Sequence, residues 1–204
     1  MDPRIVRVPP EIGYYLAGFA DGEGSFNLSF RPRPDYAVPW KVTPSFNVSQ
    51  KERVILALFK RYLGCGTLRD RPDGVWYFEV TNINAIVENV IPFFERFPFL
   101  SAKKKRDFSK FKQIVALMQG GKHLTKEGLR EILAIRELMN DGGKRRYPHA
   151  DILETLIESS ETICRASLSL EHGDDEIVRS PLQSGGPEEA VPTVAPSSFE
   201  DEEA

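Results

Sequence analysis

Two neighbouring stretches of the chain alternate between apolar and polar residues, and this pattern constrains the fold more than any other feature. Residues 25–33 place three large apolar side chains, beginning with Phe26, on one side, and residues 40–49 repeat the pattern after a short linker. A period of two is typical of β-strands with one face on a core and one face in solvent. We therefore expect two strands. Pro44 has no N–H to donate to a ladder, so we expect it at an edge or a bulge.

Helical and hairpin patterns surround these two strands. Helices are expected over residues 12–21, 51–63, 84–97, 102–118, 126–139 and roughly 147–164, and a hairpin over 67–71 and 75–81. The turn of the hairpin is Pro72–Gly74, the third helix is expected to kink near Pro92, and the second to end at Gly64. The order αββαββα followed by helices predicts an α+β domain.

Charge and composition divide the chain into segments. Residues 165–204 contain 2 basic and 10 acidic residues and are rich in Pro, Ser and Gly, which predicts a disordered acidic tail. The preceding residues carry 25 basic and 20 acidic ones, so the body is mildly basic although the whole chain has a net charge of −3. We assign residues 1–11 to an N-terminal arm and 12–164 to one folded domain. Nucleic acid therefore stays open as a partner.

Several protein classes are excluded by what the chain does not contain. It has no apolar run of about 18 residues and no apolar core after its N-terminal basic residues, so neither a membrane span nor a secretory signal is expected. Cys65 and Cys164 lie far apart, without the spacing of a metal site or a disulfide framework. We expect an intracellular protein, cytoplasmic or organellar according to its host, with no membrane partner.

The polar face of the predicted strands is rich in cations, with amides and hydroxyls between them. Basic groups suit phosphates, and short amides and hydroxyls suit base edges, although an ordinary solvated sheet face explains the same alternation. Lys144 and Arg146, in a glycine-rich loop, are further candidates for phosphate contacts. The candidate DNA-binding residues on the strands are Asn27, Ser29, Arg31, Arg33, Lys41, Thr43, Ser45, Asn47, Arg69, Arg71 and Tyr77.

The first predicted helix ends with a carboxylate between two glycines. Gly18 within the helix costs about 1 kcal/mol relative to Ala. Gly13 and Ala17 are small residues one turn apart, which would let a second helix approach closely. The flexible backbone of Gly22–Gly24 could direct both the Glu23 carboxylate and a peptide carbonyl at one hard cation. A plain helix end and turn accounts for the same residues.

The segment 16–24, LAGFADGEG, resembles the signature of the LAGLIDADG homing endonucleases. The resemblance extends to PSFNVSQK, GCGTLRDR, PFLSAKKK and NDGGKRR, and it covers about residues 12–160. The motif occurs once, so the chain is similar to the single-motif branch, whose members act as homodimers with paired motif helices. The resemblance implies an antiparallel four-stranded sheet backed by helices. It also implies a structural role for Asp21 and a dimer interface at Gly13, Ala17, Gly18 and Asp21.

The same resemblance implies a divalent-metal site for phosphodiester hydrolysis. Glu23 matches the acidic position that binds the metal, and Gly22 matches the residue whose carbonyl joins it. Gln50 matches a polar position that orders the attacking water, Lys103 a basic residue near the scissile phosphate, and Arg53 completes this polar set. The implied cofactor is Mg2+, with Mn2+ as a substitute and Ca2+ supporting binding without cleavage.

The implied activity is intron-homing cleavage of both strands of a long, pseudo-palindromic DNA site, leaving short 3′ overhangs. Such hydrolysis uses one metal to activate water and another to stabilise the leaving oxygen. One chain offers one carboxylate, so a two-fold pair would bring two Glu23 residues to adjacent phosphates.

Two alternatives to this function stay open. One is a maturase that binds intron RNA, or a cleavage-deficient DNA-binding protein of the same fold. The other is an ordinary α+β domain whose DGEG is only a turn.

Overall fold

The computed structural model describes residues 8–36, 38–142 and 145–157 of the chain. The first half contains α2 (Pro10–Glu23), β1 (Gly24–Pro32), β2 (Trp40–Gln50), α3 (Arg53–Leu63), β3 (Thr67–Asp70) and β4 (Trp76–Val80). Then follow α4 (Ile83–Ala85), the π-helical turn η1 (Ile86–Val90), α5 (Ile91–Arg96), α6 (Ala102–Gln119), η2 (Lys122–Leu124), α7 (Lys126–Glu137), η3 (Asn140–Gly142) and a helix over residues 149–157. The predicted αββαββα order is confirmed.

The four strands form one antiparallel sheet in the order β1-β2-β4-β3. Pro44 lies opposite Leu28 in an unbroken register, so the structure has an edge position there and no bulge. The pairing of β2 with β4 begins only at Phe46, so at Pro44 the strand has a partner on one side. A residue without an N–H is tolerated there because no second ladder requires it.

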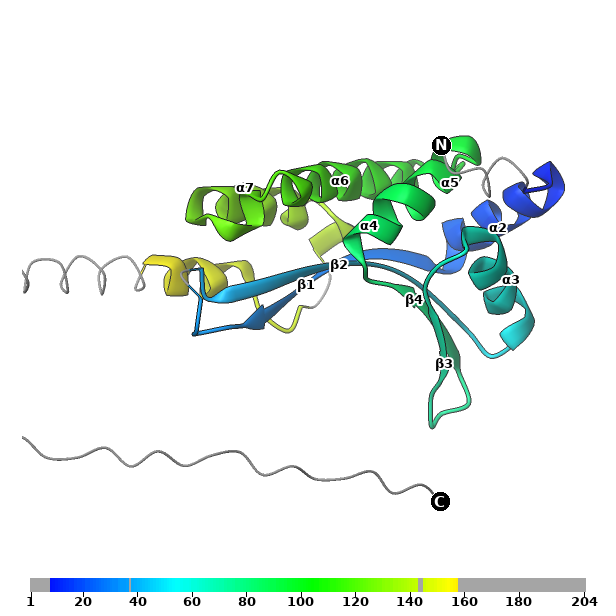
Figure 1. Cartoon of the computed structure of the whole chain (residues 1–204), viewed down its shortest axis with the longest axis horizontal. Helices are drawn as coiled ribbons and strands as arrows, with labels where there is room; N and C mark the ends of the chain where they lie inside the picture. The colour runs from blue at the N-terminus through cyan, green and yellow to red at the C-terminus, as the bar shows by residue number, and fades with distance from the viewer. Residues whose placement is uncertain (1–7, 37, 143–144, 158–204) are drawn as a thin grey trace, which may run out of the picture.

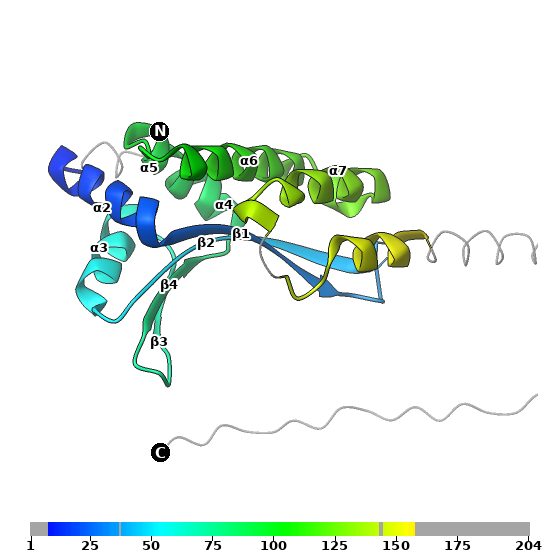
Figure 2. The ribbon, with the colours of Figure 1, turned by 180° about the vertical axis from the view of Figure 1, so that it is seen from behind.

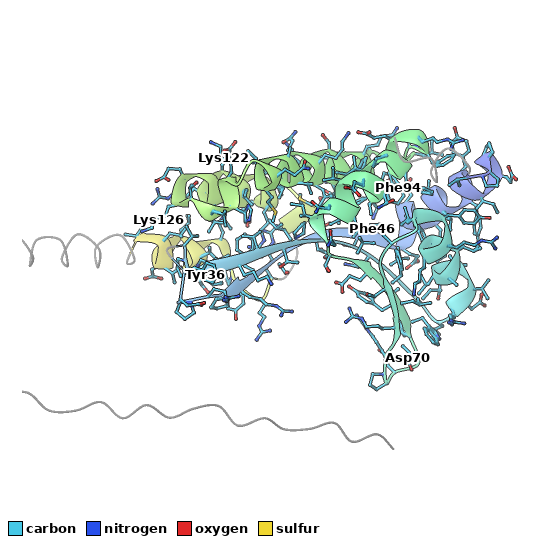
Figure 3. All side chains as sticks on the ribbon, viewed as in Figure 1. Tyr36, Phe46, Asp70, Phe94, Lys122 and Lys126 are labelled. Atoms are coloured by element: carbon cyan, nitrogen blue, oxygen red, sulfur yellow. The ribbon has the colours of Figure 1, made fainter. Side chains whose placement is uncertain are left out.

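The core lies between the sheet and the helices α4 to α7, which cover one face (Figure 1). The apolar residues of β1 and β2 point into this layer, as their alternation predicts. Phe46 of β2 and Phe94 of α5 meet there with ring centroids 5.1 Å apart (Figure 3), and Phe26 lies 5.8 Å from Phe94. The opposite face of the sheet is left open by the helices of the described ranges, and the β3–β4 hairpin projects away from the helical layer (Figures 1 and 3).

The ends of the helices follow the residues that predict them. Gly64 adopts a left-handed conformation (φ 67°) and donates its N–H to the Lys60 carbonyl, which ends α3. The side chain of Ser101 caps α6 by accepting the N–H of Lys104 at 3.2 Å. The helix expected over 84–97 is interrupted near Pro92 by the π-helical turn η1, which ends at Val90, two residues before this proline. Proline cannot donate to the carbonyl four residues earlier, and a wider turn accommodates that loss.

The boundaries of the folded domain differ from those expected. Helix α2 begins at Pro10, and Val8 is buried, so residues 8–11 belong to the fold and not to a separate arm. At the other end, the helix over 149–157 packs beside β1 and β2 (Figure 2), where the Trp40 indole donates to Thr155 Oγ1 at 2.7 Å. The expected extension of this helix to 164, the acidic tail 165–204 and Lys144 lie outside the described residues. Within the described residues, none of the helices is both long enough and apolar enough to span a membrane.

Candidate active site and nucleic-acid interface

The junction of α2 and β1 presents the Glu23 carboxylate at the protein surface. Glu23 is the last residue of α2, and both it and Gly22 are exposed. Gly24 is buried and continues into the strand, with its N–H bonded to the Ala20 carbonyl. A Cβ atom on Gly24 would lie 2.7 Å from that carbonyl oxygen, so the tight passage from helix to strand requires glycine. The turn therefore offers one carboxylate and the Gly22 backbone to solvent.

Asp21 joins the end of α2 to the start of α6. Its Oδ2 accepts the N–H groups of Leu100 and Ser101, both at 2.9 Å, and its Oδ1 accepts the Ser101 hydroxyl. Burial acts to raise the pKa of Asp21, but the hydrogen bonds from Ser101 and Leu100 outweigh it and lower the pKa. Both carboxylate oxygens are engaged, which agrees with the expected structural role of Asp21.

Adjacent lysines of α6 point to different partners. Lys103 places its Nζ 2.7 Å from Asp141 Oδ2, and Arg106 contacts the same carboxylate at 2.6 Å. The hydrogen bond and charge of Asp141 raise the pKa of Lys103, and Lys103 lowers that of Asp141. Lys104 instead donates its Nζ hydrogen to the Gly24 carbonyl, next to Glu23. Sequence reasoning did not single out Lys104, because a run of lysines does not show which member faces inward.

Gln50 and Arg53 lie at the same end of the sheet as Glu23. Gly24 is opposite Val48 in the register, so the end of β2 at Gln50 runs beside the start of β1. The Gln50 Oε1 accepts the N–H of Lys51 at 2.8 Å, and Arg53 places its guanidinium 5.3 Å from the Trp76 ring centroid. The part of the chain that the structure describes contains no group of three or more His, Cys, Asp or Glu side chains that could hold a metal ion.

The open face of the sheet carries the expected polar side chains, with one exception. The register places Asn27 opposite Ser45, Ser29 opposite Thr43 and Arg31 opposite Lys41. Arg31 and Lys41 are exposed. Ser45 is only 7% exposed, which corrects the expectation of an accessible contact at this position.

Several cations on this face already have partners within the chain. Arg69 pairs with Glu79 at 2.6 Å, and Arg33 pairs with Asp35 at 3.1 Å. Arg71 lies 4.4 Å from the ring centroid of Tyr77, and burial, with a smaller contribution from Glu79, raises the pKa of this tyrosine. These contacts hold long side chains in place over the sheet, so less rotational freedom is left to lose when a ligand binds.

A cavity of about 390 Å³ lies along the edge of β1 and has a basic lining. Its wall includes Arg31, Arg145, Arg146 and the buried Arg136, whose guanidinium donates to the Tyr147 carbonyl at 3.3 and 3.4 Å. Burial, with the nearby charge of Arg145, lowers the pKa of Arg136 to about 10. The cavity is thus positively charged at neutral pH. Sequence reasoning predicted Arg146 but missed Arg136, because a single arginine within a helix is usually exposed.

The small residues of α2 do not all face outward. A Cβ atom on Gly13 would lie 2.3 Å from the Phe97 ring, and Ala17 is 2% exposed. Both therefore pack within the chain itself, which corrects their assignment to an exposed interface surface. The exposed side of α2 instead presents Tyr14, Tyr15 and Gly18, and a Cβ atom on Gly18 or Gly22 would meet nothing within 4 Å.

Comparisons with known proteins agree with this geometry. The family model described as LAGLIDADG endonuclease matches residues 16–115. A probable intron-encoded endonuclease 2 from Neurospora crassa is 35% identical over 134 residues, which cover 63% of this chain and 29% of that protein. This chain therefore spans less than a third of the length of that relative.

Two solved structures resemble about three quarters of this chain. The homing endonuclease I-TnaI is 32% identical with a TM-score of 0.60, over 76% of this chain and 98% of that one. The archaeal intron-encoded homing endonuclease I-Vdi141I, complexed with DNA, is 27% identical with a TM-score of 0.66, over 74% of this chain and 97% of that one.

Proposed function

The chain belongs to the LAGLIDADG endonuclease family, and we propose that it is a site-specific DNA endonuclease of the intron-homing type that cuts both strands of a pseudo-palindromic duplex. The observation that carries this proposal is the position of Glu23. Its exposed carboxylate lies at the end of α2, directly where β1 begins the open, cation-bearing sheet face. The DNA complex of the similar archaeal endonuclease supports a DNA duplex as the ligand.

The donor set at this junction fits a hard divalent cation such as Mg2+. The Glu23 carboxylate and the Gly22 carbonyl are oxygen ligands, which Mg2+ prefers, and Mg2+ usually keeps several waters. When bound, such metals would activate a water and stabilise the leaving 3′ oxygen. The described residues supply one acidic ligand per subunit, so the remaining ligands would be DNA phosphates, waters and the Glu23 of a second subunit. We expect Mn2+ to substitute and Ca2+ to support binding without cleavage.

The neighbouring polar residues have distinct roles in this proposal. Gln50, beside the start of β1, orders the attacking water, and Arg53 supports it from the first turn of α3. Lys103 stabilises the scissile phosphate, which requires it to exchange Asp141 for the DNA. The exchange replaces one anionic partner with another, and it occurs at a position where both side chains are more than half exposed.

The open sheet face would lie in the major groove. Arg31 and Lys41 are exposed and lie opposite each other, so they could contact bases or phosphates. Asn27 and Ser29 precede Arg31 on β1, on the same face of the sheet. Each base-reading contact would contribute about 1–3 kcal/mol of discrimination. The basic cavity beside β1 would hold the DNA backbone at the edge of this surface.

We also propose a homodimer whose two-fold axis passes beside α2. Tyr14 and Tyr15 are 58% and 51% exposed on this helix, and two further apolar residues, Val54 and Leu100, are 69% and 86% exposed. Leu100 is bonded through its N–H to Asp21, so it lies beside the end of α2. Pairing this surface would bury apolar area and bring two Glu23 carboxylates together, one for each DNA strand.

The proposal is tested by a single isosteric substitution and a library of DNA sites. Wild type, Glu23→Gln and Glu11→Gln are each incubated with a supercoiled genomic library in Mg2+, in Ca2+ and in EDTA, and all new ends are sequenced. We expect discrete double-strand cuts that share one pseudo-palindromic site and require Mg2+. Glu11 is an exposed acid at the other end of α2, so its variant should cut like wild type.

Glu23→Gln should lose cleavage by at least a factor of about 1,000, as expected for removal of a metal ligand, and should keep its affinity for the recovered site. A loss of binding equal to the loss of cleavage would contradict the metal-ligand role. Tight binding of an intron RNA without any DNA cutting would instead favour the maturase alternative, which none of the described contacts supports.

A further inference from the structure

The first turn of α6 contains three consecutive lysines, and the middle one is unlike its neighbours. Lys103 and Lys105 are exposed, whereas Lys104 is half-buried. This turn has no acidic residue. Cations are unfavourable at a helix N-terminus, where the backbone N–H groups already carry partial positive charge. Burying one of them there adds a desolvation penalty, so Lys104 requires specific partners in this position.

Lys104 finds these partners at the α2–β1 junction. Its Nζ donates a hydrogen bond to the carbonyl of Gly24, the residue that directly follows Glu23. Burial lowers the pKa of Lys104, but the carboxylates of Asp107, Asp21 and Glu23 each act in the opposite direction. The contact that holds the ammonium group is thus the backbone carbonyl of Gly24, and the three carboxylates favour its charged form.

Together with Asp21, this contact forms a reciprocal link between two helices. Asp21 reaches from α2 to the backbone of Leu100 and Ser101 at the start of α6. Lys104 reaches back from α6 to the end of α2. The two contacts enclose Gly22–Gly24, where α2 passes directly into β1 and where two glycines would leave the backbone more conformational freedom than other residues.

We infer that Lys104 is a positioning residue for the proposed cleavage reaction, which fixes the Gly22–Gly24 turn and thereby the direction of the Glu23 carboxylate. The catalytic part of this inference rests on the proposed endonuclease function. Lys104 acts through the Gly24 carbonyl and does not contact the DNA. Lys103, one residue earlier, is the lysine assigned to the phosphate, so the two adjacent lysines have separate roles.

The test compares Lys104→Met, Lys104→Arg and the control Lys105→Met with wild type. Methionine has nearly the length of lysine and no charge, and Lys105 is an exposed lysine on the same turn. The first measurement is amide hydrogen exchange of residues 20–26 by mass spectrometry in the metal-free protein. The second is single-turnover cleavage of the recovered target site in saturating Mg2+, with the DNA dissociation constant measured in Ca2+.

We expect Lys104→Met to exchange the amides of this segment at least about fivefold faster, because local opening becomes easier when an anchoring contact is removed. Its cleavage rate should fall about 10- to 100-fold, the order of loss that displacement of a site residue produces, while its DNA affinity stays within a factor of about two of wild type. Lys104→Arg, which keeps a donor and a charge, should recover most of the rate, and Lys105→Met should match wild type.

An unchanged exchange rate or an unchanged cleavage rate in Lys104→Met would overturn the inference. So would a parallel loss of DNA affinity, since this would indicate general damage to the fold or a direct DNA contact. If wild type itself does not cut DNA, the proposed function fails. Hydrogen exchange then still shows whether Lys104 anchors the turn, so the two failures are distinguishable.

Discussion

At the residue scale, the candidate site depends on side chains whose neighbours in the sequence have the same chemistry but different roles. Asp21 and Glu23 are both acids at the end of α2, yet Asp21 is bonded to the start of α6 while Glu23 is exposed. The motif predicts this division, because the resemblance assigns each position. Lys103 and Lys104 could not be separated in the same way. Which one contacts Gly24 depends on the rotation of α6 against α2, and this rotation follows from packing far from the lysines.

The hydrogen bonds of Asp21 predict a stability that depends on pH. Its pKa is lowered from 3.8 in the folded chain, so its contribution is complete above that value and is lost as the pH falls through the lower, folded pKa. We expect Asp21→Asn to reduce the free energy of unfolding by about 1–2 kcal/mol at pH 7. Urea denaturation at pH 7, 5 and 3 should show this difference shrinking only at the lowest pH. A difference that stays constant down to pH 3 would contradict the assignment.

At the element scale, the strands and helices agree closely with the alternation and spacing that predict them. The β3–β4 hairpin turns at Gly74 with a φ of 76°, and Asp73 accepts the N–H of Val75 at 3.0 Å, as expected for Pro-Asp-Gly. The main differences lie at helix starts. Helix α3 begins at Arg53 and not at Lys51, because the backbone of Glu52 is extended (φ −85°, ψ 120°) and the helix can start only after it. Helical periodicity does not show which residue has this non-helical backbone.

The contact between α6 and η3 predicts a gain in DNA binding when it is broken. Asp141 neutralises both Lys103 and Arg106, so Asp141→Asn should free two cations beside the open sheet face. We expect tighter binding to random duplex DNA, with a slope of log K against log salt steeper by about 1–2, since each phosphate contact contributes about 0.9.

The matched control for this prediction is Glu95→Gln. It breaks the 2.8 Å ion pair between Glu95 and Lys112, which joins α5 and α6 in the helical layer. Its salt slope should equal that of wild type. Equal slopes in Asp141→Asn and wild type would show that Lys103 and Arg106 do not reach the DNA.

At the scale of the whole molecule, the proposed function requires two copies of one surface. Among the described residues, the helices cover one side of the sheet and leave the other side open (Figures 1 and 2). In this proposal, each copy would supply half of the DNA surface and one Glu23. The exposed part of α2 is the surface that can bring the two halves together, because its buried part, with Gly13, already packs on Phe97.

Gly18→Asp should therefore separate the subunits without unfolding them. Gly18 is exposed and a Cβ atom there meets nothing within the chain, so the substitution should change the free energy of unfolding of the subunit by less than about 1 kcal/mol. Sedimentation should then show a monomer, and double-strand cleavage should be lost. Ser109→Asp adds the same charge at an exposed position on α6 and should remain dimeric. A dimeric Gly18→Asp would place the interface elsewhere.

The sequence by itself determined the order of the elements, the faces of the strands and the family, because periodicity, turn residues and the LAGFADGEG segment are local signals. Only the tertiary structure decided which small residues of α2 face inward, which lysine of α6 meets Gly24 and that Arg136 lines a cavity beside β1. These features depend on how elements distant in the chain pack against one another. Close packing admits one relative rotation of two helices, and no local pattern within either helix states which rotation that is.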